Sequence, residues 1–155
     1  MKSSLLVFVC LATVTAFAAK RPDFTGSWEF NADKSKNIGM MVQVKMTQTI
    51  QQSDASLDVL SHTTFQGSDQ DMKNHYDLTG KPTTNDSPMA GPSETISKWD
   101  GEKLVTSWTS QSAVAGGDKV VRTETRSLST EGSTMTVESV RGSNPPVVIV
   151  FEKKR

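Results

Sequence analysis

The chain has 155 residues, which suits one compact domain. It carries 17 basic and 17 acidic residues, a formal net charge of zero. The two signs are interleaved along the chain, so no basic surface predicts binding to nucleic acid or to an anionic membrane. The only cysteine is Cys10, which leaves the rest of the chain without a thiol for a disulfide, a metal site or a nucleophile.

The first element in chain order is an export signal. The chain starts Met-Lys, continues into the uncharged stretch 3–17, and reaches Ala-Phe-Ala at 16–18. A positive start, a short apolar middle and a small-residue exit are the three parts of a secretory signal. A transmembrane helix needs about 20 apolar residues, and this stretch is shorter and rich in Ser, Thr and Ala.

We therefore expect residues 1–18 to be a signal peptide, with cleavage near Ala18 or Ala19. The mature chain, 19–155, is then a single domain of a secreted or periplasmic protein that does not insert into the membrane. Cys10 lies inside the leader, so the mature protein has no cysteine.

Beyond the leader, apolar and polar residues alternate, as they do in β-strands with one buried face. The first expected strand, 26–30, places Trp28 and Phe30 on one face. A polar loop over 31–39 follows. Further strands are expected at 42–51, 57–65, 72–78, 94–99, 103–111, 119–128, 134–140 and 147–152, and 83–92 is predicted to be a surface loop.

The expected fold is therefore all-β. The connections are short, as between antiparallel neighbours, and Asp100-Gly101 between two alternating runs indicates a tight hairpin. A sheet of about eight or nine strands hides its apolar face and its edges by curling into an up-and-down barrel. A two-sheet β-sandwich is the alternative that periodicity leaves open.

The first strand resembles that of the lipocalins and fatty-acid-binding proteins, which begin with Gly-x-Trp. It is more similar to the first strand of a group of small secreted bacterial lipocalin-like proteins. Later pieces at 99–104 and 127–137 also resemble that group. The resemblance implies a calycin-type barrel whose closed end is plugged by Trp28. The matching residues of the first-strand pattern are Gly26, Trp28, Asn31, Lys34 and Ser35.

Two features of the larger families are absent from the sequence. Fatty-acid-binding proteins insert a pair of helices after the first strand, and 32–41 is too short for such a pair. They also hold the ligand carboxylate with Arg-x-Tyr in the last strand, where this chain has Ile149 and Phe151.

A barrel of about eight strands is wide enough to be filled by its own side chains or to hold one small ligand. Met and aromatic side chains suit an adaptable apolar pocket, although the same residues also make an ordinary core. The candidate lining consists of Trp28, Val44, Met46, Tyr76, Trp108 and Phe151.

Other polar groups give weaker signals. His62 and His75 are the only histidines; we expect both to be exposed, and predict no metal and no cofactor. Arg122, Glu124 and Arg126 alternate along one strand and are expected to form an outward row of surface ion pairs; pointing inward, they would suit an anionic head group. No nucleophile, base and orienting group share a motif, so we expect no catalysis.

The function predicted from the sequence is non-catalytic binding or transport of a small hydrophobic ligand inside the barrel of an exported protein. The alternative is a solid-cored secreted interaction or inhibitor module that acts through its outer surface and loops. The expected partner in the first case is one small apolar molecule.

Overall fold

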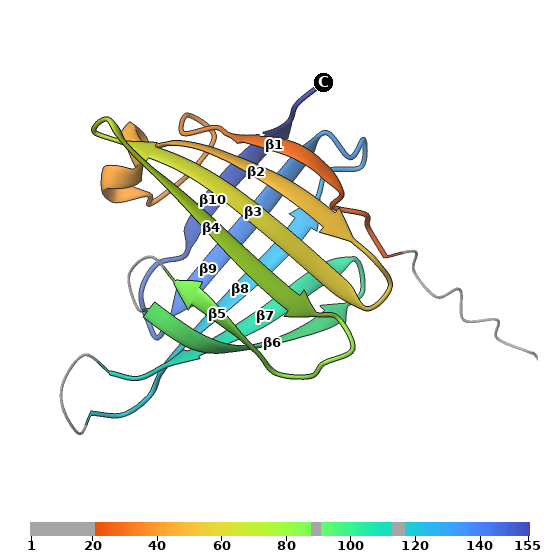
Figure 1. Cartoon of the computed structure of the whole chain (residues 1–155), viewed down its shortest axis with the longest axis vertical. Helices are drawn as coiled ribbons and strands as arrows, with labels where there is room; N and C mark the ends of the chain where they lie inside the picture. Colours follow the sequence, from red (N-terminus) through yellow and green to blue (C-terminus); the bar gives the residue numbers. More distant parts are fainter. Residues whose placement is uncertain (1–20, 88–90, 113–116) are drawn as a thin grey trace, which may run out of the picture.

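The computed structural model describes residues 21–87, 91–112 and 117–155 (Figure 1). The expected signal peptide and Cys10 lie outside the described residues. The described chain forms ten strands and one short 3-10 helix. These are β1 (Gly26–Phe30), η1 (Gly39–Gln43), β2 (Lys45–Gln52), β3 (Ser56–Phe65), β4 (Ser68–Asp77), β5 (Thr83–Ser87), β6 (Gly91–Asp100), β7 (Lys103–Ser110), β8 (Val120–Leu128), β9 (Thr134–Arg141) and β10 (Val147–Lys153).

The ten strands form one antiparallel sheet in the order β4-β3-β2-β1-β10-β9-β8-β7-β6-β5. Each strand pairs with its neighbour in sequence except at β4–β5, and β1 also pairs with β10. The sheet therefore curls round until its two edges, β4 and β5, face each other (Figure 1). The expected up-and-down barrel is confirmed, and the β-sandwich alternative is wrong because the described strands make one continuous sheet.

β5 occupies residues that the sequence predicted to be a loop. Its inward-facing residues are polar, with Asn85 and Ser87 buried. An apolar–polar alternation is therefore missing, although the strand pairs in full with β6. The predicted start of the second strand, at residue 42, is also wrong. Val42 belongs to η1, and β2 begins only at Lys45.

Two hairpins show how the turns are built. In β6–β7, Asp100 pairs with Lys103, so Gly101 and Glu102 form the loop and only the glycine has a positive φ, of 58°. The predicted hairpin is present, but its turn lies one residue later than expected. In β3–β4, Gln66 and Gly67 form the loop with φ of 50° and 80°, the pattern of a type I′ turn.

The β4–β5 seam is held by side-chain amides. Asn85 accepts a hydrogen bond from the His75 amide at 2.7 Å and donates one to the His75 carbonyl at 2.8 Å. Asn74 donates from the other side to the Asp86 carbonyl at 3.0 Å. These bonds occupy backbone groups that an edge strand would otherwise leave unpaired.

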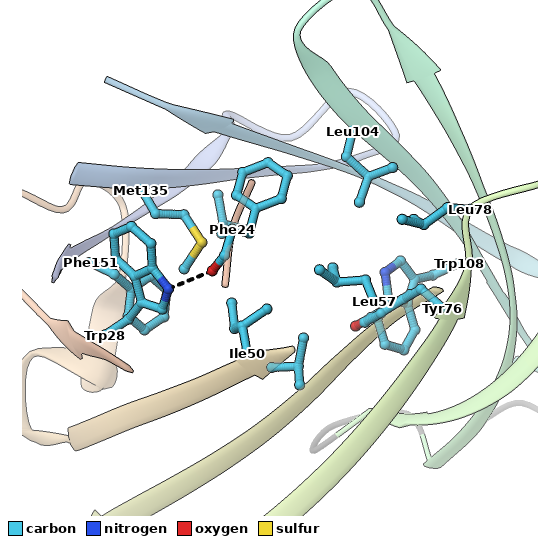
Figure 2. Close-up of a cluster of buried hydrophobic side chains, with 12 residues drawn as sticks. Phe24, Trp28, Ile50, Leu57, Tyr76, Leu78, Leu104, Trp108, Met135 and Phe151 are labelled. Atoms are coloured by element: carbon cyan, nitrogen blue, oxygen red, sulfur yellow. Dashed lines mark hydrogen bonds between the residues drawn. The ribbon is translucent and has the colours of Figure 1, made fainter. Parts of the chain in front are cut away.

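The end of the barrel where β1 begins is closed by Phe24 and Trp28, both 0 % exposed. The Trp28 indole N–H donates to the Phe24 carbonyl at 2.9 Å, so the ring is buried without an unsatisfied donor (Figure 2). Gly26 between them has φ 139°, and a Cβ there would meet the Lys153 side chain at 2.9 Å. The end of the Lys153 side chain is flexible and can give way, but the φ of Gly26 is one that other residues rarely adopt, so the backbone at this closed end requires the glycine of Gly-x-Trp.

Substitution of Trp28 by Ala is expected to lower the free energy of unfolding by about 3–5 kcal/mol, since it empties a fully buried site. The measurement is urea denaturation followed by far-UV circular dichroism. The matched control is Val121→Ala on the exposed outer face of β8, for which we expect a change within about 0.5 kcal/mol. Equal effects of the two substitutions would show that Trp28 does not close the barrel.

Candidate ligand site inside the barrel

The structure places most of the predicted lining on the inner face. Trp28, Tyr76, Trp108 and Phe151 are all buried and belong to one hydrophobic cluster, against which Met46 packs. Figure 2 shows the four buried residues among side chains that converge from different strands. Val44 is different: it follows η1, lies before β2, and is partly exposed.

The two ends of the interior differ in packing. At the closed end, Leu57, Leu104 and Met135 are buried together with Phe24 and Trp28. Toward the opposite end, inward-facing side chains stay partly exposed, so solvent reaches the inner wall there. We call this the open end of the barrel. Its partly exposed inner residues include Phe30, Met46, Phe65, Met72, Val120, Arg122, Val147 and Ile149, and also the polar residues Thr63, Ser110 and Ser139.

The expectation of an outward charged row on β8 is wrong, because Arg122, Glu124 and Arg126 point into the barrel. Cross-strand partners share a face of the sheet, and Arg126 lies between the buried residues Leu104 and Val137. The exposed fractions of the three side chains are 31 %, 14 % and 6 % from Arg122 to Arg126. The row therefore descends from the open end toward the closed end.

The charges in this row do not balance. Arg126 donates to Glu124 at 3.3 Å, and its guanidinium also lies 6.0 Å from the Phe24 ring centre. The nearest Arg122–Glu124 nitrogen–oxygen distance is longer, 3.9 Å. Because one carboxylate faces two guanidinium groups, the row carries a formal charge of +1. Arg122 is the cation with the weaker partner and the greater access to solvent.

Two aromatic residues lie beside the end of the charged row that is nearer the open end. The Arg122 guanidinium lies 4.6 Å from the Trp108 ring centre, a cation–π contact. Tyr76 meets Trp108 edge to face with ring centres 5.9 Å apart. The Trp108 indole nitrogen is buried and has no hydrogen-bond partner among the described residues. Gln48 Oε1 on β2 is likewise buried and without a partner there.

Polar side chains that the sequence analysis missed complete the wall beside β8. Ser97 and Thr106 are buried and bonded to each other at 2.8 Å. Thr95 accepts a hydrogen bond from Asn85 at 2.7 Å. Along their strands these residues alternate in step with Trp99, Leu104 and Trp108, so they lie on the same face of the sheet. This alternation was the one feature of the sequence that could have indicated their inward position.

Both histidines lie on the outer face of the β3–β4 hairpin and are exposed, as expected. His62 contacts Asp71 at 2.6 Å, which raises the pKa of His62, and His75 contacts Asp58 at 2.7 Å. The second pair borders an outer hollow of about 340 Å³ over β2–β5. Among the described residues, no three His, Cys, Asp or Glu side chains gather as metal ligands would.

Comparisons with known proteins agree with this fold. No family model and no curated protein matches the chain. Many solved structures match the chain. Three of them, each matching 85 % of it, are a REP1-NXSQ fatty acid transporter (14 % identity, 96 % of its chain, TM-score 0.65), a variant of the fluorescent protein UnaG (16 %, 96 %, 0.62), and Echinococcus granulosus fatty-acid-binding protein 1 (13 %, 98 %, 0.67).

At these identities the likeness shows the fold alone. The chain thus has the calycin-type barrel of fatty-acid-binding proteins, and the more distant of the two predicted resemblances is supported at the level of fold. The nearer resemblance, to secreted bacterial lipocalin-like proteins, stays a prediction. Within the described ranges, no helix combines the length and apolar character needed to cross a bilayer.

Tyr76 offers a direct test of this interior. Burial raises the pKa of its phenol well above the ordinary value of 10.0, and the nearby Glu124 carboxylate raises it further. It is the only tyrosine in the chain, so absorbance at 295 nm reports it alone. We expect no ionisation near pH 10 in the folded protein, and an ordinary titration in concentrated guanidinium.

The raised pKa of Tyr76 makes the stability of the fold depend on pH. The unfolded chain loses the phenol proton near pH 10 and the folded one does not, so the folded state loses stability as the pH rises above 10. An ordinary titration of the folded protein near pH 10 would contradict the buried position of Tyr76.

Proposed function

We propose that this protein is an exported, non-catalytic carrier of a small amphipathic molecule, with the apolar part of the ligand inside the barrel and an anionic group at Arg122. The observation that supports the proposal most strongly is the inward charged row of β8. Two guanidinium groups and one carboxylate leave a positive charge on an inner wall whose other buried residues are apolar or uncharged polar.

Arg122 is the better placed of the two arginines for an anion. Its longer distance to Glu124 and its partial exposure toward the open end leave donors free for a ligand. Arg141 is its cross-strand neighbour and is exposed, which adds positive charge at the same end. Arg126 is buried against Phe24 and Met135 and serves the packing of the closed end.

The apolar part of the ligand would contact side chains such as Met46, Phe30 and Ile149, which are inward-facing yet not fully covered. Burial of apolar surface contributes about 25 cal/mol per Å². The fatty-acid-binding titles of two fold neighbours, although they describe other proteins, are in keeping with this ligand class. Fatty-acid-binding proteins hold the carboxylate with Arg-x-Tyr in the last strand, where this chain has Ile149 and Phe151. The cation proposed here, Arg122, lies on β8 instead.

The binding test compares dodecanoate with dodecanol by isothermal titration calorimetry on the purified protein. We expect dodecanoate to bind about tenfold more tightly, because a hydrogen bond to a charged group is worth about 1.5–3 kcal/mol and Arg122 is partly screened by solvent. Arg122→Gln should abolish this preference.

The matched control is Lys98→Gln, which removes one positive charge from the exposed outer side of β6. It should leave the preference for dodecanoate unchanged. Absence of binding by both ligands would refute the carrier function, and equal binding of the two would refute the anionic site.

Export is proposed from the leader sequence and has its own test. When the full chain is expressed in a bacterium, we expect the intact mass of the product to lack the first 18 or 19 residues. The double substitution Ala16→Lys with Ala18→Lys should leave the precursor uncut, since signal peptidase requires small residues at these positions. A wild-type product that keeps the full-length mass would contradict export by cleavage.

A further inference from the structure

The inner wall beside Arg122 presents a compact polar patch. By strand register, Trp108 lies between Thr95 of β6 and Arg122 of β8, and Thr106 lies between Ser97 and Glu124. These six residues therefore form neighbouring positions on three adjacent strands. Thr95, Ser97 and Thr106 are each at most 3 % exposed, so the patch belongs to the interior.

Trp108 is the residue in this patch whose buried hydrogen-bond donor has no acceptor among the described residues. It is 6 % exposed, and its indole nitrogen has no acceptor among the described residues. A buried donor without a partner costs about 1–3 kcal/mol, whereas Trp28 in the same barrel has its acceptor. Figure 2 shows the ring nitrogen of Trp108 on the side that faces the other core residues. The nitrogen is covered by neighbouring atoms, so a ligand acceptor reaches it only when the side chains around it shift.

The adjoining hydroxyls also have donor capacity left. Ser97 and Thr106 share one hydrogen bond, at 2.8 Å. Because each hydroxyl has one proton to donate, this bond uses one of their two donors. Across the barrel, Gln48 Oε1 is a buried acceptor without a partner in the described structure. The interior thus offers more hydrogen bonding than a plain hydrocarbon chain can use.

The position of Trp108 relative to Arg122 limits where the ligand's polar atoms lie. The guanidinium stacks 4.6 Å from the ring centre, so an anion at Arg122 and an acceptor at the indole N–H are close neighbours. Both groups then belong to the same end of the ligand, a few bonds apart. The rest of the molecule would lie against the partly exposed apolar residues of the inner wall, such as Phe30, Met46 and Ile149.

Given the carrier function proposed above, we propose that the ligand bears a second oxygen, a hydroxyl or carbonyl, a few bonds from its anionic group, and that this oxygen accepts a hydrogen bond from Trp108. A 3-hydroxy carboxylate with an alkyl tail is the simplest molecule of this class. The polar patch of β6, β7 and β8 sets the preference, and the apolar side chains that face the tail disfavour an oxygen at its far end.

Three ligands of equal chain length test the proposal by calorimetry: dodecanoate, 3-hydroxydodecanoate and 12-hydroxydodecanoate. One added hydrogen bond should make 3-hydroxydodecanoate bind about two- to tenfold more tightly than dodecanoate. The 12-hydroxy compound should bind more weakly than dodecanoate, since its terminal hydroxyl enters apolar surroundings. Equal affinities for dodecanoate and 3-hydroxydodecanoate would overturn the second-oxygen proposal and leave the carrier function standing. Failure of all three to bind would overturn both.

The matched variants are Trp108→Phe and Trp99→Phe. Each removes a buried indole N–H that has no partner in the described structure, but Trp99 lies near the closed end, stacked on Phe24 with ring centres 6.1 Å apart. We expect Trp108→Phe to abolish the preference for the 3-hydroxy ligand and Trp99→Phe to keep it. The same preference in Trp108→Phe would refute the role of that indole.

A second measurement needs no substitution at Trp108. The chain has three tryptophans, so ¹⁵N-labelled indole groups give three separate N–H signals. Binding of 3-hydroxydodecanoate should shift the Trp108 signal to lower field and slow its hydrogen exchange, and dodecanoate should do so less. An unchanged Trp108 signal in the bound protein would overturn the proposed contact.

Discussion

The hydrogen bond from the Trp28 indole to the Phe24 carbonyl determines how the interior of this barrel is organised. It lets a large amphipathic ring lie fully buried, and it holds the segment before β1 across one end. Phe24 then provides the surface on which Trp99 stacks and over which the Arg126 guanidinium lies. One end of the barrel is consequently filled by packed side chains, and the less densely covered inner wall lies toward the other end.

This division explains how a barrel can hold three charged side chains on one inner strand. Arg126 lies deepest and has Glu124 as its counter-ion, so a buried charge is paired as its desolvation requires. Arg122 lies where solvent still reaches the wall, and Trp108 covers one face of its guanidinium. The same strand therefore serves structure at one end and offers a cation at the other.

The sequence predicts the backbone of this protein better than its interior. Strong alternation and glycine turns indicated nine of the ten strands, and Gly26-x-Trp28 indicated the closed end. β5 was missed because its inward residues are Thr, Asn and Ser, and Val44 was assigned to a strand that starts after it. The charged row was placed outside because a Glu flanked by two Arg residues usually forms a ladder of surface ion pairs. Its cross-strand partners Leu104 and Val137, which no single strand reveals, and the low exposure of its side chains show that it faces inward.

The seam between β4 and β5 gives the barrel wall a joint of a different kind from its other contacts. Elsewhere neighbouring strands are joined by ladders of peptide groups, which separate only if the strands themselves come apart. Here Asn74 and Asn85 span the joint with side chains, which can rotate away while both strands keep their other partners. Because amides carry no titratable proton, these three hydrogen bonds do not depend on the ionisation of the side chains that make them.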